Sequence, residues 1–378
     1  MIKKIFLPSL AVLLLTGCIS TAEKQAREQN NRRMINSIMY PGTARLKYTL
    51  DRGADPNLKD RYGVPVLCRA VAAGKVEHVK MLLACGADVN ATDNDGETAV
   101  FAAVAANNRE ILDMLLKKGA SINVCNKNGK TPAMEAARLG HIDMLEYLLS
   151  SGADINAVDN NTAGLAAYAA SADKNALSLL TLLKEKGIKI DLDNTSLLGS
   201  PFLRALFFNR VDTALALLPE MQDLNANNRM KQIGKLAAYY AISHNQIKLL
   251  KGLIDKKLEL NYHEPFSYKF VSFIKIDGIY KLAARNDVID KRYTPLMYAC
   301  IFGRTDMIKL LVDSGANPLI ENNEGRIAQD YAKDNATTRM INKLTREWRN
   351  KYLKGKQTQK GIVIKKNPNV KRTTIFGM

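Results

Sequence analysis

A tripeptide of the Gly-Ala-Asp type recurs every 33 residues through the first half of the chain. Its copies begin at Gly53, Gly86, Gly119 and Gly152, and an asparagine stands four residues after each glycine. A fixed period of about 20 to 50 residues predicts an array of stacked units, each of which buries its apolar face only against its neighbours. The length of 378 residues therefore indicates an array of repeats and not two or three globular domains.

The segment from Thr131 to Gly152 shows why each repeat folds as a pair of helices. Thr131 can cap a first helix, and Pro132 suits its first position, where a missing N–H costs nothing. Residues 142–149 carry isoleucine and leucine at helical spacing, so a second helix has one apolar stripe. Gly152 then ends the second helix in a left-handed conformation, which glycine adopts cheaply.

These features resemble the ankyrin repeat, in which two antiparallel helices and a hairpin finger make a unit of about 33 residues. The resemblance implies an all-α ankyrin-repeat solenoid of about nine helix-hairpin-helix units, with short β-hairpin fingers and one extended finger insert. The copies are clear at residues 64–162 and 293–325. They are weak at 163–261, where Lys257 replaces the glycine expected at the end of a second helix.

The N-terminus has the features of an export signal. Lys3 and Lys4 precede an apolar run from Ile5 to Leu15, which is shorter than the about 20 residues of a membrane-spanning helix. The run ends in Leu-Thr-Gly-Cys, which resembles the bacterial lipobox and implies that Cys18 is the lipid attachment site. An ordinary signal peptide with a chance cysteine is the alternative. By the same resemblance, Ile19 after the cysteine implies the periplasmic face of the outer membrane, where nucleic acid is not a partner.

The remaining cysteines are scattered through the array. Export to an oxidising compartment permits disulfides, and a bond between Cys68 and Cys85 is conceivable because they fall on neighbouring antiparallel helices. With Cys125 and Cys300 the number of remaining cysteines is even. Buried free thiols are the other interpretation.

One finger carries about 25 more residues than the repeat requires. In this insert, residues 262–292, aromatic residues alternate with polar ones as far as Asp277-Gly278, which predicts a β-hairpin turning at that pair. Its aromatic side chains are candidate anchors for a partner. The alternative is that the insert folds back over the weak neighbouring unit. The candidate anchors are Phe266, Tyr268, Phe270 and Phe273.

The C-terminal segment concentrates positive charge. Residues 343–372 contain eleven Lys and Arg against Glu347 alone, in a chain with a formal net charge of +18. Glycine and proline within it argue against one continuous helix. Such an arm would be drawn to anionic lipid headgroups or to an acidic partner, or it is a solvated terminus without a role.

The chain is thus expected to comprise four successive parts. They are a lipoprotein signal peptide at 1–17, an N-terminal lipidated linker at 18–33, the ankyrin repeat array at 34–348 with its insert at 262–292, and a basic, flexible C-terminal tail at 349–378.

Signatures of catalysis are missing from the sequence. The four histidines are not at metal-ligand spacing, and no phosphate-binding loop or nucleophile elbow is present. Asp93, Asp95, Asp154 and Asp159 fall in fingers, where carboxylates close turns on the nearby backbone. We therefore predict a protein that is not an enzyme and that needs no cofactor or metal.

The ankyrin resemblance implies binding of another protein through the finger tips and the exposed last turn of each first helix. Among the helix positions, Ile301 and Phe302 are the strongest candidates, because two adjacent exposed apolar side chains are costly unless a partner or the insert covers them. The finger-tip candidates are Arg61, Tyr62, Asn94, Asp95, Glu97, Lys127, Asn128, Lys130, Lys291 and Tyr293, and the helix candidates are Arg138, Leu139, Ile301 and Phe302.

Lipid-anchored ankyrin proteins facing the periplasm resemble two functional groups. One neutralises membrane-attacking effectors delivered by type VI secretion, so our first hypothesis is an immunity protein against a phospholipase-type toxic effector. The alternative is an envelope structural or stress-support protein that holds a periplasmic enzyme or anionic lipid.

Overall fold

The structure is a computed structural model that describes residues 21–352, except for 195, 197, 263–270, 277–278 and 285–292. Cys18, the signal peptide at 1–17 and most of the basic tail, from residue 353 onward, therefore lie outside the described residues. The chain divides into two compact units, Met1–Lys189 and Ile190–Met378, called unit 1 and unit 2 below.

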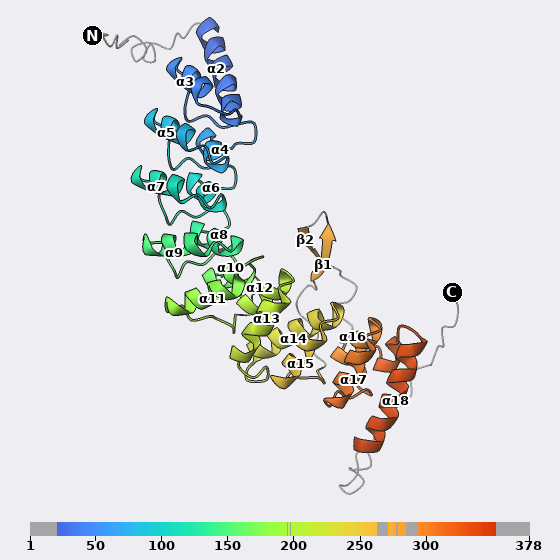
Figure 1. The fold of residues 1–378 in the computed structure, drawn as a ribbon. Coiled ribbons are helices and arrows are strands. Elements are labelled where there is room, and N and C mark those ends of the chain that lie inside the picture. The colour runs from blue at the N-terminus through green and yellow to red at the C-terminus, as the bar shows by residue number, and fades with distance from the viewer. Residues whose placement is uncertain are drawn as a thin grey trace, which may run out of the picture. The chain divides into compact units, whose positions relative to one another are not determined.

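Unit 1 is built from helix pairs joined by short turns (Figure 1). The first helices α4, α6, α8 and α10 contact one another in that order, and each packs against the second helix of its own pair. The helices are α2 (Thr21–Met39), α3 (Ala44–Asp51), α4 (Val66–Ala72), α5 (Val76–Ala84), α6 (Ala99–Ala105), α7 (Arg109–Lys117), α8 (Pro132–Leu139), α9 (Ile142–Ser150), α10 (Leu165–Ala170) and α11 (Ala176–Glu185).

Unit 2 continues the same pattern with longer and less regular elements. Along it α12 contacts α14, α14 contacts α16, and α16 contacts η2. The elements are α12 (Pro201–Phe207), α13 (Val211–Leu217), η1 (Leu218–Glu220), α14 (Asn228–Ser243), α15 (Ile247–Asp255), β1 (Val271–Ile276), β2 (Ile279–Ala284), α16 (Pro295–Ile301), α17 (Thr305–Asp313), η2 (Ala328–Tyr331) and α18 (Asn335–Tyr352).

The helix boundaries have the causes that the sequence suggests. The Thr131 hydroxyl accepts a hydrogen bond from the Met134 N–H at 3.3 Å, and Thr294 caps α16 in the same way through Met297. Alanines of the first helices, such as Ala103 and Ala136, are fully buried, so neighbouring first helices approach closely. The described part of the chain is therefore mostly helical, as expected of stacked repeats.

The degenerate unit keeps its turn despite the missing glycine. Lys257 adopts a left-handed backbone with φ of 61°, and its N–H donates to the Ile254 carbonyl. The same unit lacks a Thr-Pro start, and its first helix α14 instead begins at Asn228, where the Asn227 side chain accepts from Met230 N–H at 2.9 Å. Tertiary packing thus preserves the unit with other capping groups and with some backbone strain.

The prediction of short β-hairpin fingers is not supported. Among the described residues the short fingers contain no strands, only an isolated bridge between Lys59 and Pro65. They are hydrogen-bonded turns. A side chain closes each turn within four residues, so the flanking segments are too short to pair as strands.

The long insert contains a pair of antiparallel strands. Strands β1 and β2 pair antiparallel from Val271↔Ala284 to Ile276↔Ile279 and so flank residues 277–278, which confirms the predicted strand pair. Phe273 lies on β1 opposite Leu282, whereas Phe266, Tyr268 and Phe270 fall outside the described residues.

Cys68, Cys85, Cys125 and Cys300 are all free thiols, so no bond joins Cys68 to Cys85. Cys68 and Cys300 are buried, and burial raises the pKa of each thiol to about 12. Within the described residues, no helix combines the length and apolarity needed to cross a membrane.

Candidate functional site

Each finger of unit 1 is closed by one side chain at its start. The Asp93 carboxylate accepts the N–H groups of Asp95 and Glu97, both at 2.9 Å, and Asp159 accepts from Asn161 and Ala163 in the same manner. The predicted turn-forming role of these aspartates is confirmed. In both residues one carboxylate oxygen closes the turn on the backbone, and the second Asp159 oxygen accepts from the Tyr168 hydroxyl at 2.8 Å.

Neighbouring fingers are tied to one another. The Asn94 side-chain amide donates to the Tyr62 carbonyl at 2.9 Å, and the Lys127 N–H donates to the Asp95 carbonyl at 2.9 Å. The Asn160 N–H continues the series by donating to Asn128 at 3.0 Å. These bonds hold the tips at a fixed spacing, so the structure assembles the predicted tip residues of unit 1 into one row. We call this set the finger row: Arg61, Tyr62, Asn94, Asp95, Lys127 and Asn128.

A second series of hydrogen bonds, made by asparagine side chains, joins successive repeats. The Asn123 side chain donates to the Gly152 carbonyl at 3.1 Å and accepts from the Asp154 N–H at 2.8 Å. Asn57 and Asn90 make the equivalent pair of contacts in the preceding repeats. The recurring asparagine of the sequence therefore connects successive repeats.

Three of the predicted site residues, Glu97, Lys130 and Arg138, lie around the buried carboxylate of Glu135. Lys130 Nζ lies 2.9 Å from Glu135 and 3.0 Å from Glu97, and Arg138 makes a forked contact to Glu135 at 2.7 and 2.9 Å. The Asn126 amide also donates to Glu97 at 3.0 Å. We call Glu97, Lys130, Glu135 and Arg138 the charge cluster. It connects the base of one finger to the adjacent first helix, α8.

Glu135 is held ionised in the charge cluster. Its burial favours the neutral acid, but hydrogen bonds from Arg138 and Lys130 together with their positive charges outweigh burial and lower the pKa of the carboxyl. The same contacts raise the pKa of Arg138, chiefly through the hydrogen bond to Glu135. Sequence reasoning placed Glu135 only in the helix-starting motif. Its spacing of three residues from Arg138 was the available signal.

Tyr62 stands at the exposed end of the finger row. Its side chain is 58% exposed, and the guanidinium groups of Arg61 and Arg69 lie 4.7 and 5.8 Å from the ring centroid. Arg69 is itself anchored by Asp60 at 2.6 Å. Arg69, whose guanidinium lies near the Tyr62 ring, was not predicted from the sequence. Leu139, the other predicted position on α8, is only half-buried and stands beside the exposed Arg138.

In unit 2 the strongest sequence candidates are not exposed. Ile301 and Phe302 are each half-buried, and the ring of Tyr239 on α14 lies 6.2 Å from that of Phe302. Part of the cover that two adjacent apolar side chains need therefore comes from α14, and their role in contacting a partner stays a prediction. Lys291 falls outside the described residues.

Tyr293 belongs to a cluster of aromatic rings in unit 2. Its ring meets Tyr298 edge to face at 5.4 Å and Tyr331 at 5.0 Å. Tyr298 is buried, and burial raises the pKa of its phenol. The cluster therefore acts first as packing between α16 and η2, with Tyr293 at its half-buried edge.

The described residues contain no group of three or more His, Cys, Asp or Glu side chains placed to hold a metal ion.

Family models match in two places. A model of three ankyrin repeats matches residues 34–126 and 67–159, and a single-repeat model matches residues 291–323. The chain therefore contains ankyrin repeats. Such repeats are typically binding scaffolds without catalysis, and they imply protein partners in general.

A curated protein with a similar segment is the mitochondrial disaggregase of Bos taurus, which is 28% identical over 144 residues. The match covers 35% of this chain and 21% of the disaggregase, so this chain spans about a fifth of that protein's length.

Proposed function

We propose that this protein is a non-enzymatic ankyrin scaffold, tethered by an acyl chain on Cys18 to the periplasmic face of the outer membrane, that binds a protein partner through the finger row. The observation that supports it most directly is the set of backbone and amide bonds between successive fingers. Because the tips are already ordered, a partner would not have to supply the free energy of ordering them.

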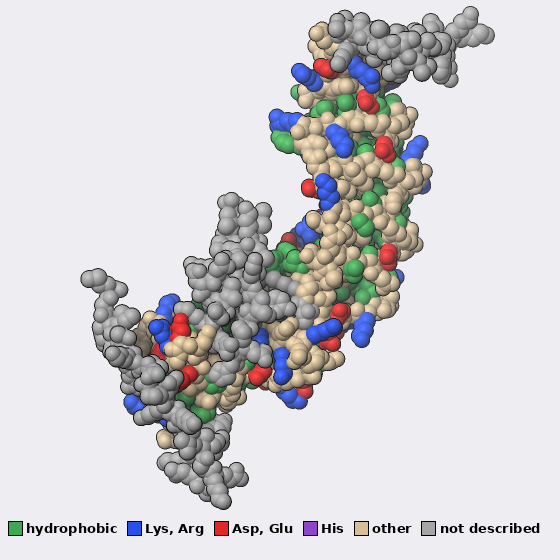
Figure 2. Space-filling view, turned by 180° about the vertical axis from the view of Figure 1, so that it is seen from behind, with side chains coloured by type: hydrophobic (Ala, Val, Ile, Leu, Met, Phe, Trp, Pro, Cys, Tyr) green, Lys and Arg blue, Asp and Glu red, His purple; other side chains and the backbone are tan. Residues whose placement is uncertain are grey.

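The chemistry of the finger row suits a partner surface of mixed charge. Tyr62 offers an exposed aromatic ring, Asp95 a carboxylate and Lys127 an ammonium group. On the face that Figure 2 shows, basic and acidic side chains are interspersed and do not form one large patch of either sign. A folded protein with its own mixed charges therefore fits the finger row better than a polyanion does.

The finer proposal is that the partner is a secreted phospholipase-type effector and that the protein confers immunity to it. It rests on the proposed membrane anchor, on the ordered finger row and on a sequence without a recognisable catalytic motif. The finger row and charge cluster would then recognise the effector, with the aromatic insert at 262–292 as a further contact.

The test uses the triple variant Tyr62→Ala/Asp95→Ala/Lys127→Ala. Lys80→Ala/Lys117→Ala is the control, because both lysines are exposed on second helices of the same unit. Each protein is used to capture partners from an envelope extract, and each strain competes with its siblings. We expect the triple variant to lose the hydrolase and to be killed, and the control to retain both properties. Equal capture by both variants would refute the finger row as the contact surface.

The alternative function, envelope support through anionic lipid or an acidic enzyme, is favoured by one observation. Helix α18 presents exposed Arg339, Lys343, Arg346 and Arg349 ahead of the basic tail. This function predicts that binding weakens as the salt concentration rises and that deletion of residues 349–378 abolishes it. Immunity predicts that this deletion has little effect and that deletion of 262–292 abolishes binding.

A further inference from the structure

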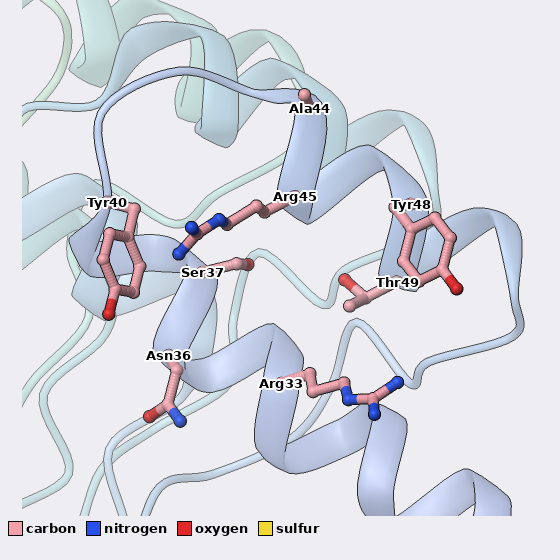
Figure 3. Close-up of a pocket in the computed structure, with 8 residues that line it drawn as sticks. All are labelled: Arg33, Asn36, Ser37, Tyr40, Ala44, Arg45, Tyr48 and Thr49. Carbon is pink, nitrogen blue, oxygen red and sulfur yellow. The ribbon is translucent and has the colours of Figure 1, made fainter.

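Helices α2 and α3 form a pocket at the start of unit 1 (Figure 3). Its cavity volume is about 480 Å³, within the size range of small-ligand sites. We call it the cap pocket. The lining residues that matter here are Arg33, Ser37, Tyr40, Arg45, Tyr48 and Thr49.

The charged side chains that line the cap pocket are all positive. Arg33 and Arg45 reach into it at opposite ends, Arg45 beside Tyr40 and Arg33 toward Tyr48 (Figure 3). The described lining contains no acidic residue. The hydroxyls of Ser37 and Thr49 donate to helix carbonyls at 2.7 and 2.8 Å, so they do not donate to a ligand. The lining therefore selects an anion, through guanidinium groups that suit phosphate oxygens.

The rim of the cap pocket is aromatic and exposed. Tyr40 and Tyr48 are each 48% exposed, and the adjacent Met39 is 73% exposed. The Arg45 guanidinium lies 4.2 Å from the centroid of the Tyr40 ring, and Arg52 lies 4.5 Å from that of Tyr48. Tyrosine beside arginine, with an apolar body and a polar tip, is typical of the zone between lipid headgroups and water.

The charge around the cap pocket has the same sign. Residues 25–52 contain six basic side chains against Glu28 and Asp51, a net charge of 6 − 2 = +4. A surface of anionic lipid attracts basic residues that come near it, with an effect of about fivefold in partitioning for each residue. The cap therefore carries enough charge for the membrane surface to orient it.

The tether permits this contact. Cys18 precedes the first described helical residue, Thr21, by three positions, which span at most about 11 Å. Arg33 lies twelve positions further along α2, about 18 Å at 1.5 Å per residue. A chain acylated at Cys18 can thus lay α2 along the membrane and bring Arg33 to the headgroups.

We infer that the cap pocket binds the phosphate headgroups of anionic phospholipid and so holds α2 and α3 against the membrane surface. The choice of lipid as the source of the phosphate rests on the membrane anchor of the proposed function. Binding by the pocket is nevertheless measurable without the anchor.

The experiment uses the mature chain, residues 18–378, with Cys18→Ser to prevent acylation. Vesicles of phosphatidylcholine alone or with phosphatidylglycerol are titrated, and inorganic phosphate is tested separately. Met39→Trp reports contact through a blue shift and through quenching by brominated lipid, read against the chain whose single tryptophan is Trp348. Arg33→Gln/Arg45→Gln tests the pocket. Lys80→Gln/Lys117→Gln removes equal charge from exposed positions on second helices of unit 1 as the control.

We expect a blue shift and quenching at position 39 with anionic vesicles only. The pocket variant should partition about 25-fold more weakly, the product of two fivefold effects, and the control variant clearly less so. Equal losses in the two variants, or vesicle binding without a signal from Trp at position 39, would overturn the inference. A matching blue shift with inorganic phosphate alone would show a free-anion site and would contradict the inference. A blue shift that appears only when a protein partner is added would show a peptide site and would also contradict it.

Labelling of cells with a palmitate analogue separates the two proposals. Absence of label on Cys18 refutes the anchor in the proposed function, while vesicle binding by the unacylated chain still supports the pocket. Labelling combined with no pocket-dependent vesicle binding refutes the pocket alone.

Discussion

Removal of the charge on Glu135 tests whether the charge cluster stabilises unit 1. In Glu135→Gln, Lys130 loses one charge-assisted hydrogen bond at a side chain that is only 18% exposed, which costs about 1.5 kcal/mol. The Arg138 side chain is 42% exposed, so solvent screens its pairing and the loss there is about 0.5 kcal/mol. The expected total is about 2 kcal/mol of local stability at pH 7.

Amide hydrogen exchange of α8 is the suitable measurement, because repeats of an array open locally and need not unfold in one transition. A loss of about 2 kcal/mol corresponds to about 30-fold faster exchange. Glu146→Gln is the matched control: its carboxylate is 54% exposed and lies 3.7 Å from Lys186, so we expect almost no change.

The effect of pH follows from the lowered pKa of Glu135. A carboxyl group whose pKa is lower in the folded state contributes stability above its unfolded value of 4.5 and loses it as the pH falls through the folded value. The difference between the wild type and Glu135→Gln should therefore shrink below about pH 4.5. Equal exchange of the two proteins at pH 7, or an unchanged difference at pH 3, would refute the stabilising role of the cluster.

The remaining predictions concern single positions. Lys257→Gly should raise the free energy of unfolding of unit 2 by about 1 kcal/mol in urea unfolding, because it relieves a left-handed backbone; destabilisation would show that the Lys257–Asp223 ion pair outweighs the strain. Asn123→Ala should increase exchange around Gly152 and Asp154 at a cost of about 1 kcal/mol, and unchanged exchange there would contradict its role as a connector. Burial, together with the nearby Lys75, lowers the pKa of the buried His78 below 6.5, so α5 should keep full stability above that pH and lose it as the pH falls toward the folded value. Exchange measured from pH 7.5 to 5 should show this loss, and His78→Phe should abolish it; the same pH dependence in His78→Phe would exclude the histidine as its cause.

Much of the local structure could be predicted from residue types and spacing. Thr131 and Thr294 cap the helices that were expected at those positions, and strands flank residues 277–278 as the aromatic alternation indicated. These features depend on interactions within a few residues, which a local pattern records directly. The acylation of Cys18, the roles of the finger row and the immunity hypothesis stay predictions.

The surroundings of the candidate site residues could not be predicted, because they depend on neighbours distant in sequence. The ring of Phe302, for example, lies beside that of Tyr239, more than sixty positions away. Similarly, nothing near Glu135 in the sequence points to Glu97, which shares Lys130 with it.

The 33-residue period by itself determined that the chain stacks helix pairs, because an amphipathic pair can bury its apolar stripe only against copies of itself. Only the tertiary structure decided which polar groups meet between repeats, how the degenerate unit is capped and where a pocket opens between α2 and α3. A repeat pattern shows which positions are equivalent in successive repeats, but it does not show which side chains of neighbouring repeats touch. The side-chain packing of each particular repeat decides those contacts.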